Sequence, residues 1–167
     1  MCLRRRNADN LMSSVYLGLG SNQGGKLENI KKAVTLISER VGDILALSGF
    51  YKTQPWGYTS SEIYLNAAVW INTMLNPESL LSVTQDIERE VGRKEKTTTD
   101  GYHDRIIDID ILLYNDLIIQ TECLTIPHPL MHQRLFVLQP LSEIAPDFVH
   151  PVFGKTIAEL CGLLNAN

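Results

Sequence analysis

Hydrophobic positions follow two periods along the chain, one typical of strands and the other typical of helices. Apolar runs that are continuous or alternate with polar residues predict strands at 15–19, 44–51, 64–73 and 106–114. Apolar residues that recur every three or four positions predict helices at 26–41, at 77–91 and near 157–164. Glycine follows each of the first two helices, and Asn76-Pro77 gives the second a cap and a first-turn proline.

The predicted order of elements is strand, helix, two strands, helix, strand. This is the βαββαβ order of an α+β, ferredoxin-like fold, in which helices back an antiparallel sheet. A turn at Asn115-Asp116 predicts a hairpin between the fourth strand and residues 117–119. From residue 124 onward we expect a proline-punctuated segment before the last helix. Because this fold hosts many activities, function has to be argued from particular side chains.

Length and charge restrict the class of protein. The 167 residues suffice for one domain with its own core, which we expect at 15–167 after a disordered extension at 1–14. The net charge of −4 argues against general nucleic-acid binding, and no apolar run is long enough to cross a membrane. Three widely spaced cysteines without a signal peptide are typical of reduced thiols, so we expect a soluble cytoplasmic protein.

The fourth predicted strand carries two aspartates on one face. Alternate residues of a strand share a face, so Asp108 and Asp110 lie opposite the isoleucines at 107, 109 and 111. Their backbones are roughly 6.6 Å apart, and two full charges at that distance repel by about 2.5 kcal/mol at an effective dielectric constant of about 20. A bound magnesium ion with phosphate ligands would remove this repulsion. From the pair alone, two solvated aspartates on an edge strand are an equal alternative.

Cationic residues surround this strand. Arg105 precedes it, and Arg93, Lys94 and Lys96 lie in the polar segment before it. They form either a solvated charged loop or a clamp on phosphate, for which the planar guanidinium group is suited. In the second case we expect residues 93–104 to act as a lid that orders over a nucleotide.

Two further patterns match known sites poorly. Residues 20–26 have the spacing of a P-loop, but Leu27 stands where Ser or Thr should hold magnesium. His128 and His132 have a zinc-type spacing, but Pro129 intervenes and no further ligand is evident. His128 is then either a structural histidine or a hydrogen-bond donor to phosphate, with Arg134 beside it.

Several residues suit a flat heterocycle. Asn66 lies within an apolar strand, where its amide must find hydrogen-bond partners. Trp56 lies in a Pro-Trp-Gly loop, where it is harder to place in a core than Tyr64 or Phe136. A heterocycle that an amide binds and that aromatic rings stack against would explain this set.

In combination these motifs resemble the 6-hydroxymethyl-7,8-dihydropterin pyrophosphokinase family, from about residue 15 to the last helix. The matching stretches are 19–22, 50–57, 64–68, 85–93, 105–112 and 127–136, in this order and at these spacings. The resemblance implies transfer of a diphosphoryl group from ATP to the hydroxymethyl oxygen of the pterin, with release of AMP, as a step of folate synthesis. It also implies small-molecule substrates, with no nucleic acid or membrane as partner, in a monomer or a homodimer.

The resemblance also implies a role for each matching position. Asp108 and Asp110 would bind two magnesium ions, and Arg93 and Arg105 would stabilise the charge on the transferred group. Residues that would contact ATP are Gln85, Glu88, His128 and Arg134. Residues that would bind the pterin are Thr53, Trp56, Tyr64, Asn66 and Phe136. Chemistry of this kind depends mainly on positioning and electrostatics.

Two other classes of protein fit the predicted fold. An RNA-recognition module has the same order of elements but needs a basic motif with stacking aromatics on its central strands, which residues 64–73 lack. A small-molecule-sensing domain without catalysis would not require the Asp108 and Asp110 pair with its flanking arginines.

Overall fold

The computed structural model describes residues 12–53, 63–92 and 106–166 of the chain. The first half comprises β1 (Ser13–Ser21), α1 (Lys26–Arg40), β2 (Gly42–Leu47), β3 (Tyr51–Thr53), β4 (Tyr64–Thr73) and α2 (Pro77–Gly92). The second half comprises β5 (Asp108–Tyr114), β6 (Ile119–Gln120), β7 (Thr125–Ile126), a 3-10 turn (Met131–Gln133), α3 (Leu135–Ile144) and α4 (Ile157–Asn165). Within these ranges, no helix has the length and the apolar character that crossing a membrane would require.

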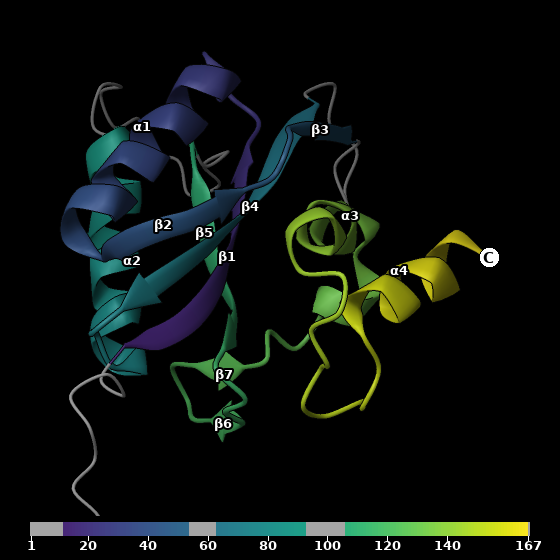
Figure 1. Cartoon of the computed structure of the whole chain (residues 1–167). Helices are drawn as coiled ribbons and strands as arrows, with labels where there is room; N and C mark the ends of the chain where they lie inside the picture. The colour runs from purple at the N-terminus through teal and green to yellow at the C-terminus, as the bar shows by residue number, and fades with distance from the viewer. Residues whose placement is uncertain (1–11, 54–62, 93–105, 167) are drawn as a thin grey trace, which may run out of the picture.

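The main sheet is antiparallel, with the strand order β2-β4-β1-β5 (Figure 1). This is the order of a ferredoxin-like βαββαβ core, so the predicted fold class is confirmed. Strand β3 pairs with the first residues of β4, from Tyr64 to Asn66. The predicted bounds of β4 match those of the structure, and α2 extends only one residue further, to Gly92.

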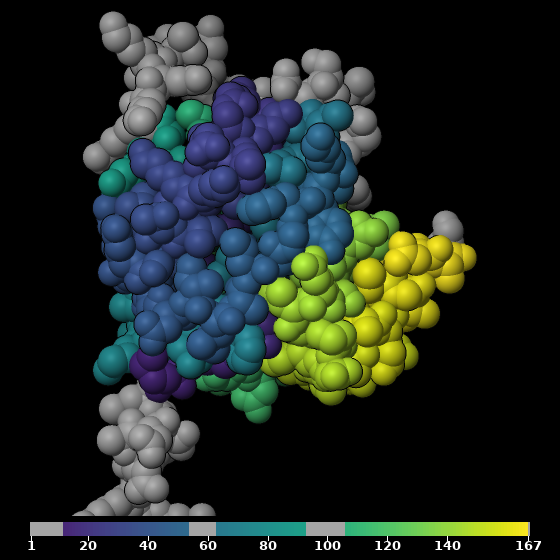
Figure 2. Space-filling view, turned by 45° about the horizontal axis from the view of Figure 1, so that its top comes forward, coloured from purple at the N-terminus to yellow at the C-terminus, as the bar shows by residue number. Residues whose placement is uncertain are grey.

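The two faces of the sheet are covered by different pairs of helices. Helices α1 and α2 pack on one face, and α3 and α4 lie on the other (Figure 1). The first core includes Leu17, Ile71 and Ile87, and the second includes Leu112 and Leu138, all of them fully buried. In Figure 2 the α3–α4 unit, yellow-green to yellow, packs directly against the blue and teal segments of the first half. The two faces therefore have separate apolar cores.

Strand β1 begins at Ser13, two residues before the predicted start, and the disordered extension predicted for 1–14 is wrong for these two residues. Ser13 and Ser14 pair with Thr73 and Asn72 of β4. The Ser14 hydroxyl also accepts a hydrogen bond from Trp70 Nε1 at 2.7 Å. These polar residues are ordered by tertiary hydrogen bonds, which a hydrophobic pattern does not reveal.

The strand predicted at 44–51 is two strands, β2 and β3, separated at residues 48–50. The Ser48 hydroxyl accepts a hydrogen bond from the Ala68 N–H and donates one to the Gly49 carbonyl, both at 2.8 Å. The Ser48 hydroxyl therefore stands in for a backbone acceptor toward β4. The strand is interrupted here although the apolar pattern continues.

The hairpin predicted between β5 and residues 117–119 is wrong. Strand β6 pairs with β7 and not with β5. Asn115 adopts a positive φ of 46°, and its Oδ1 accepts a hydrogen bond from the Ser14 N–H at 2.8 Å. The turn is therefore attached to β1, and the chain leaves β5 instead of folding back along it.

Candidate active site

Three strands bring the predicted site residues together in two rows across the sheet. In the β1–β4 and β1–β5 ladders, Gly20 lies opposite both Asn66 and Asp108. Two residues earlier, Gly18 lies opposite Ala68 and Asp110. Because residues opposite each other in a ladder share a face, the amide and both carboxylates lie on the side of the sheet that α3 covers.

The two glycines leave the middle of these rows without side chains. A Cβ atom at position 20 would lie 3.1 Å from Asn66 Oδ1, closer than such atoms normally approach. A Cβ atom at position 18 would meet the side chain of Leu112 at 3.4 Å. The backbone of β1 therefore forms an open floor between the amide of β4 and the carboxylates of β5.

A cavity of about 170 Å³ lies over this floor, between the sheet and the start of α3. Seven of the predicted site residues line it: Thr53, Tyr64, Asn66, Asp108, Asp110, Arg134 and Phe136. The remaining lining residues are Gly18, Leu19, Gly20, Ala67 and Val137. Residues as far apart in the sequence as Gly18 and Val137 thus share one site.

The two aspartates stay accessible on the face opposite the isoleucine core. Ile107, Ile109 and Ile111 are buried in the core, as predicted, while Asp108 and Asp110 on the opposite face remain half-buried. Within the described ranges, no group of three or more His, Cys, Asp or Glu side chains is placed to hold a metal ion. Two carboxylates nevertheless suit magnesium, which commonly takes one or two from the protein and the rest of its ligands from phosphates and water.

The amide of Asn66 is held in one orientation. Its side chain is buried, and its Nδ2 donates a hydrogen bond to Thr53 Oγ1 at 2.7 Å. The Oδ1 atom lies over the Gly20 side of the cavity. A buried amide in this orientation presents an acceptor to a ligand that lies on the floor.

Helix α3 supplies the opposite wall. Arg134 is its N-cap residue, and the Arg134 guanidinium carbon lies 5.7 Å from the centre of the Phe136 ring. The Phe136 ring and the Tyr64 ring both line the cavity, one from α3 and the other from β4. This arrangement leaves an aromatic wall on the helix side and an aromatic residue on the sheet side.

His128 lies close to the charged end of this site. Burial lowers the pKa of its imidazole, the carboxylate of Asp110 raises it and the guanidinium of Arg134 lowers it again. Its Nδ1 accepts a hydrogen bond from the Leu130 N–H at 3.3 Å, which leaves Nε2 as the protonated nitrogen. The imidazole is therefore neutral near pH 7 and can donate a hydrogen bond from Nε2.

The two α2 residues expected near ATP lie outside the cavity lining. Glu88 Oε1 accepts a hydrogen bond from the Ile109 N–H at 2.7 Å, and Ile109 separates the two aspartates. Gln85 is exposed one helical turn earlier. The contact made by Glu88 ties α2 to β5, and the role of both residues toward a nucleotide stays a prediction.

Three predicted site residues, Trp56, Arg93 and Arg105, lie outside the described residues, as does the predicted lid at 93–104. The sequence interpretation missed the glycine floor of the cavity. The pattern Leu17-Gly-Leu-Gly20 contains the signal, because alternate glycines within a strand leave one of its faces without side chains.

The fold and the site together define an α+β enzyme class in which a small-molecule cavity ends at a pair of carboxylates. A model of the family described as 7,8-dihydro-6-hydroxymethylpterin-pyrophosphokinase (HPPK) matches residues 16–146. The chain belongs to this family.

Two of the similar proteins carry the same name. The 2-amino-4-hydroxy-6-hydroxymethyldihydropteridine pyrophosphokinase of Porphyromonas gingivalis is 48% identical over 141 residues, which cover 84% of this chain and 95% of that protein. The enzyme of the same name from Aquifex aeolicus is 40% identical over 148 residues, 89% of this chain and 90% of that protein. The chain therefore matches these relatives over nearly their full length.

The fold of this chain is similar to that of a solved structure. A crystal structure of wild-type Plasmodium falciparum HPPK-DHPS with SDX-DHP matches with a TM-score of 0.73 and 19% sequence identity. The match covers 91% of this chain but only 44% of that chain. At this identity the likeness shows the fold alone.

Proposed function

We propose that this protein transfers a diphosphoryl group from ATP to the hydroxymethyl oxygen of 6-hydroxymethyl-7,8-dihydropterin, in folate biosynthesis. The family match and the near-full-length relatives named as pyrophosphokinases support the reaction. The observation that carries the proposal within the molecule is the row Asn66–Gly20–Asp108. It places an amide suited to a heterocycle and a carboxylate suited to a metal ion at the two ends of one floor.

In this reaction the hydroxymethyl oxygen forms a bond to the β-phosphorus of ATP and loses its proton. The bond between the β-phosphorus and the oxygen that bridges it to the α-phosphorus breaks, and AMP leaves with that oxygen. Asp108 and Asp110 would hold two Mg²⁺ ions, which when bound neutralise phosphate charge and favour attack at phosphorus. The two aspartates would thereby hold the triphosphate at the β5 end of the floor.

The pterin would occupy the other end of the cavity. Asn66 would accept a hydrogen bond from the pterin's amide edge through Oδ1, while Thr53 keeps the amide in place. The Tyr64 and Phe136 rings would stack on the two faces of the heterocycle, and Trp56 would complete its enclosure. Bound in this way, the hydroxymethyl group would point along the floor toward the carboxylates.

We infer a phosphate-binding role for a second group of residues. Arg134 would pair with phosphate oxygens from the α3 wall, and neutral His128 would donate from Nε2 beside it. Gln85 and Glu88 would contact the nucleotide near the edge of β5. Arg93 and Arg105 would stabilise the charge that develops on the transferred group, and residues 93–104 would close over ATP.

The proposal is tested by incubating the protein with ATP, Mg²⁺ and 6-hydroxymethyl-7,8-dihydropterin and separating the products. The expected products are AMP and the pterin diphosphate in equal amounts, and neither should form without the pterin. Formation of ADP and a pterin monophosphate would indicate an ordinary kinase, and absence of any nucleotide product would refute the activity.

We also infer a cytoplasmic location and a monomeric or homodimeric state. Cys123 and Cys161 are free thiols, as expected in a reducing compartment. Cell fractionation and light scattering of the purified protein test the two statements separately.

A further inference from the structure

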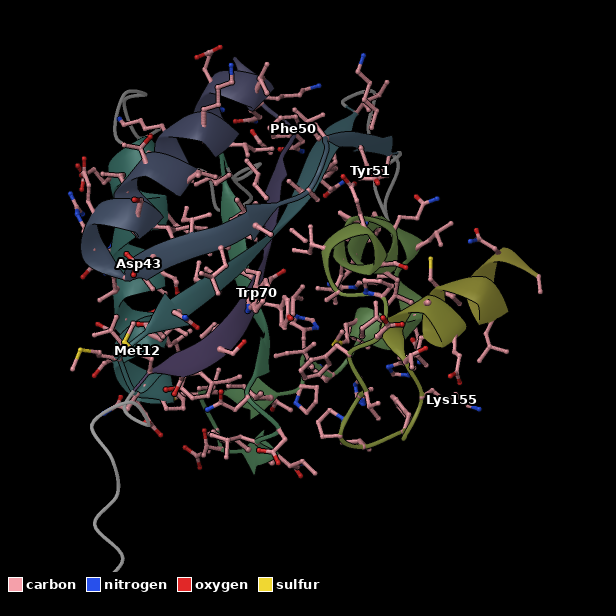
Figure 3. All side chains as sticks on the ribbon, viewed as in Figure 1. Met12, Asp43, Phe50, Tyr51, Trp70 and Lys155 are labelled. Atoms are coloured by element: carbon pink, nitrogen blue, oxygen red, sulfur yellow. The ribbon has the colours of Figure 1, made fainter. Side chains whose placement is uncertain are left out.

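A glutamate of α3 joins the helix to the turn between β2 and β3. Glu143 accepts hydrogen bonds from the Gly49 N–H at 3.0 Å to Oε1 and 3.1 Å to Oε2. Its Oε2 also accepts a hydrogen bond from the Tyr51 hydroxyl at 2.5 Å. Figure 3 shows Tyr51 at β3, on the side where α3 lies. One carboxylate thus binds two donors of a segment more than 90 positions away.

The segment that Glu143 holds leads directly to the cavity. Tyr51 lies opposite Asn66 in the β3–β4 ladder, and Thr53 lies two residues further along the same strand. Thr53 accepts the hydrogen bond from Asn66 Nδ2 that fixes the amide. The position of β3 therefore decides where the Thr53 hydroxyl lies and how the Asn66 amide is turned.

The helix that carries Glu143 also carries the opposite wall. Phe136 and Val137 of α3 line the cavity, about two turns before Glu143. The contacts of Glu143 consequently connect the Thr53–Asn66 wall with the Phe136 wall. They bridge the two surfaces that would hold a flat heterocycle.

We propose that Glu143 is a positioning residue for the pterin site, which it controls by holding β3 at a fixed distance from α3. This inference rests on the proposed function. It concerns the pterin end of the cavity only, because Asp108 and Asp110 belong to β5, which β1 and α2 hold in place.

Attachment of α3 to the sheet does not depend on Glu143. Leu138 and Leu141 of α3 are completely buried and belong to the second core, whereas Glu143 is exposed. Apolar packing therefore holds α3 on the sheet. The Glu143 carboxylate adds directional hydrogen bonds between α3 and the segment that leads into β3. The hydrogen bond to Glu143 raises the pKa of the Tyr51 phenol.

Steady-state kinetics of the full-length protein test this role. Loss of charged hydrogen bonds at an exposed position should raise the KM for the pterin by about three- to tenfold in Glu143→Ala, with the KM for ATP unchanged. Tyr51→Phe removes one of the donors and should raise the pterin KM by a smaller factor. Glu143→Gln keeps one carbonyl acceptor and should fall between Glu143→Ala and the parent protein.

Glu159→Ala is the matched control, since Glu159 is an exposed carboxylate of α4 and lines no part of the cavity. It should leave both KM values unchanged. A double-mutant cycle completes the test: if the two side chains act through one contact, Tyr51→Phe should add little to Glu143→Ala.

The outcomes separate the two proposals. A parent protein that forms no AMP refutes the proposed function. An active parent protein whose Glu143 variants keep a normal pterin KM, or change both KM values equally, overturns the positioning role alone. If Glu143→Ala fails to fold, Tyr51→Phe and Glu143→Gln decide by the same criterion.

Discussion

Asn66 donates a hydrogen bond from Nδ2 to Thr53 Oγ1 at 2.7 Å, and this contact turns its Oδ1 toward the floor of the cavity. The amide is buried within β4, between strands β1 and β3. Its orientation is therefore set before any ligand arrives. A preorganised acceptor loses little conformational entropy when it binds a heterocycle.

Replacement of this amide should weaken pterin binding. In Asn66→Ala, the pterin's amide edge loses its partner, which costs about 1–3 kcal/mol of binding free energy. The affinity should be measured by calorimetry in the presence of a non-hydrolysable ATP analogue and Mg²⁺. Asn72→Ala is the control, because Asn72 lies on the same strand outside the cavity. Unchanged affinity in Asn66→Ala would move the pterin site elsewhere.

Pterin affinity should also depend on the absence of a side chain at Gly20. In Gly20→Ala the new Cβ atom would lie 3.1 Å from Asn66 Oδ1, so the amide has to shift away from its present position. We expect pterin affinity to fall by about tenfold, equivalent to about 1.4 kcal/mol. Affinity for the ATP analogue alone should change far less. A normal pterin affinity would show that the floor has room for a methyl group.

Gly162, unlike Gly20, lies in open surroundings, and its replacement tests stability and not binding. Gly162 lies within α4, and a Cβ atom at this position would contact nothing within 4 Å. Gly162→Ala should therefore stabilise the protein by about 0.5–1 kcal/mol through helix propensity, without altering turnover. Denaturant unfolding measures the effect, and a loss of stability would contradict the open environment of this position.

The carboxylate pair should be essential for turnover but not for folding. Asp108→Ala or Asp110→Ala should lower kcat by at least about 100-fold, because charge on the transferred group loses its metal-mediated stabilisation. The thermal midpoint should stay close to that of the parent protein, since both side chains are half-buried and lie outside the apolar core. Asp116→Ala, in the exposed turn after β5, is the control. Near-normal turnover of either variant at ordinary Mg²⁺ concentration would exclude the pair as metal ligands.

Stability should depend on pH through His150. Burial lowers the pKa of this histidine, and the nearby His132 lowers it further. The unfolded chain, with a pKa of about 6.5, then binds more protons than the folded protein at mildly acidic pH. The free energy of unfolding should accordingly decrease as the pH falls below about 6.5.

The His150→Asn variant isolates this contribution. His150 Nδ1 accepts hydrogen bonds from the N–H groups of Val152 and Phe153 at 3.2 and 3.3 Å, and asparagine can supply a similar acceptor. Urea unfolding at about pH 7.5 and about pH 5.5 should show a smaller loss of stability in the variant than in the parent protein. Equal losses would assign the pH dependence to other groups, such as His128, whose pKa is also lowered by burial.

The sequence predicted secondary structure and burial correctly where local patterns agree with tertiary packing. Strand β4 and helix α2 have clear apolar periods and clear end signals, so their predicted bounds match the structure closely. The alternation around Asp108 likewise predicted which residues are buried. Such segments bury one face and expose the other, which is the property that periodicity measures.

The site's second wall could not be predicted in this way. Helix α3 contains Pro140, whose ring disfavours a helix interior, and it was predicted only as part of a proline-punctuated segment. It forms because Leu138, Pro140 and Leu141 are buried against the sheet. Pairing of Gly20 with both Asn66 and Asp108 is likewise a property of strand order, which no local pattern contains.

The most direct measurement is a crystal structure of the protein with Mn²⁺ in place of Mg²⁺, a non-hydrolysable ATP analogue and 6-hydroxymethyl-7,8-dihydropterin. We expect anomalous peaks for two metal ions within coordination distance of Asp108 and Asp110. We also expect the pterin between Tyr64 and Phe136, with its amide edge on Asn66 Oδ1 and its hydroxymethyl group facing the β-phosphorus. Metal ions bound away from the aspartates, or a pterin bound outside the cavity over Gly18 and Gly20, would contradict the proposed site.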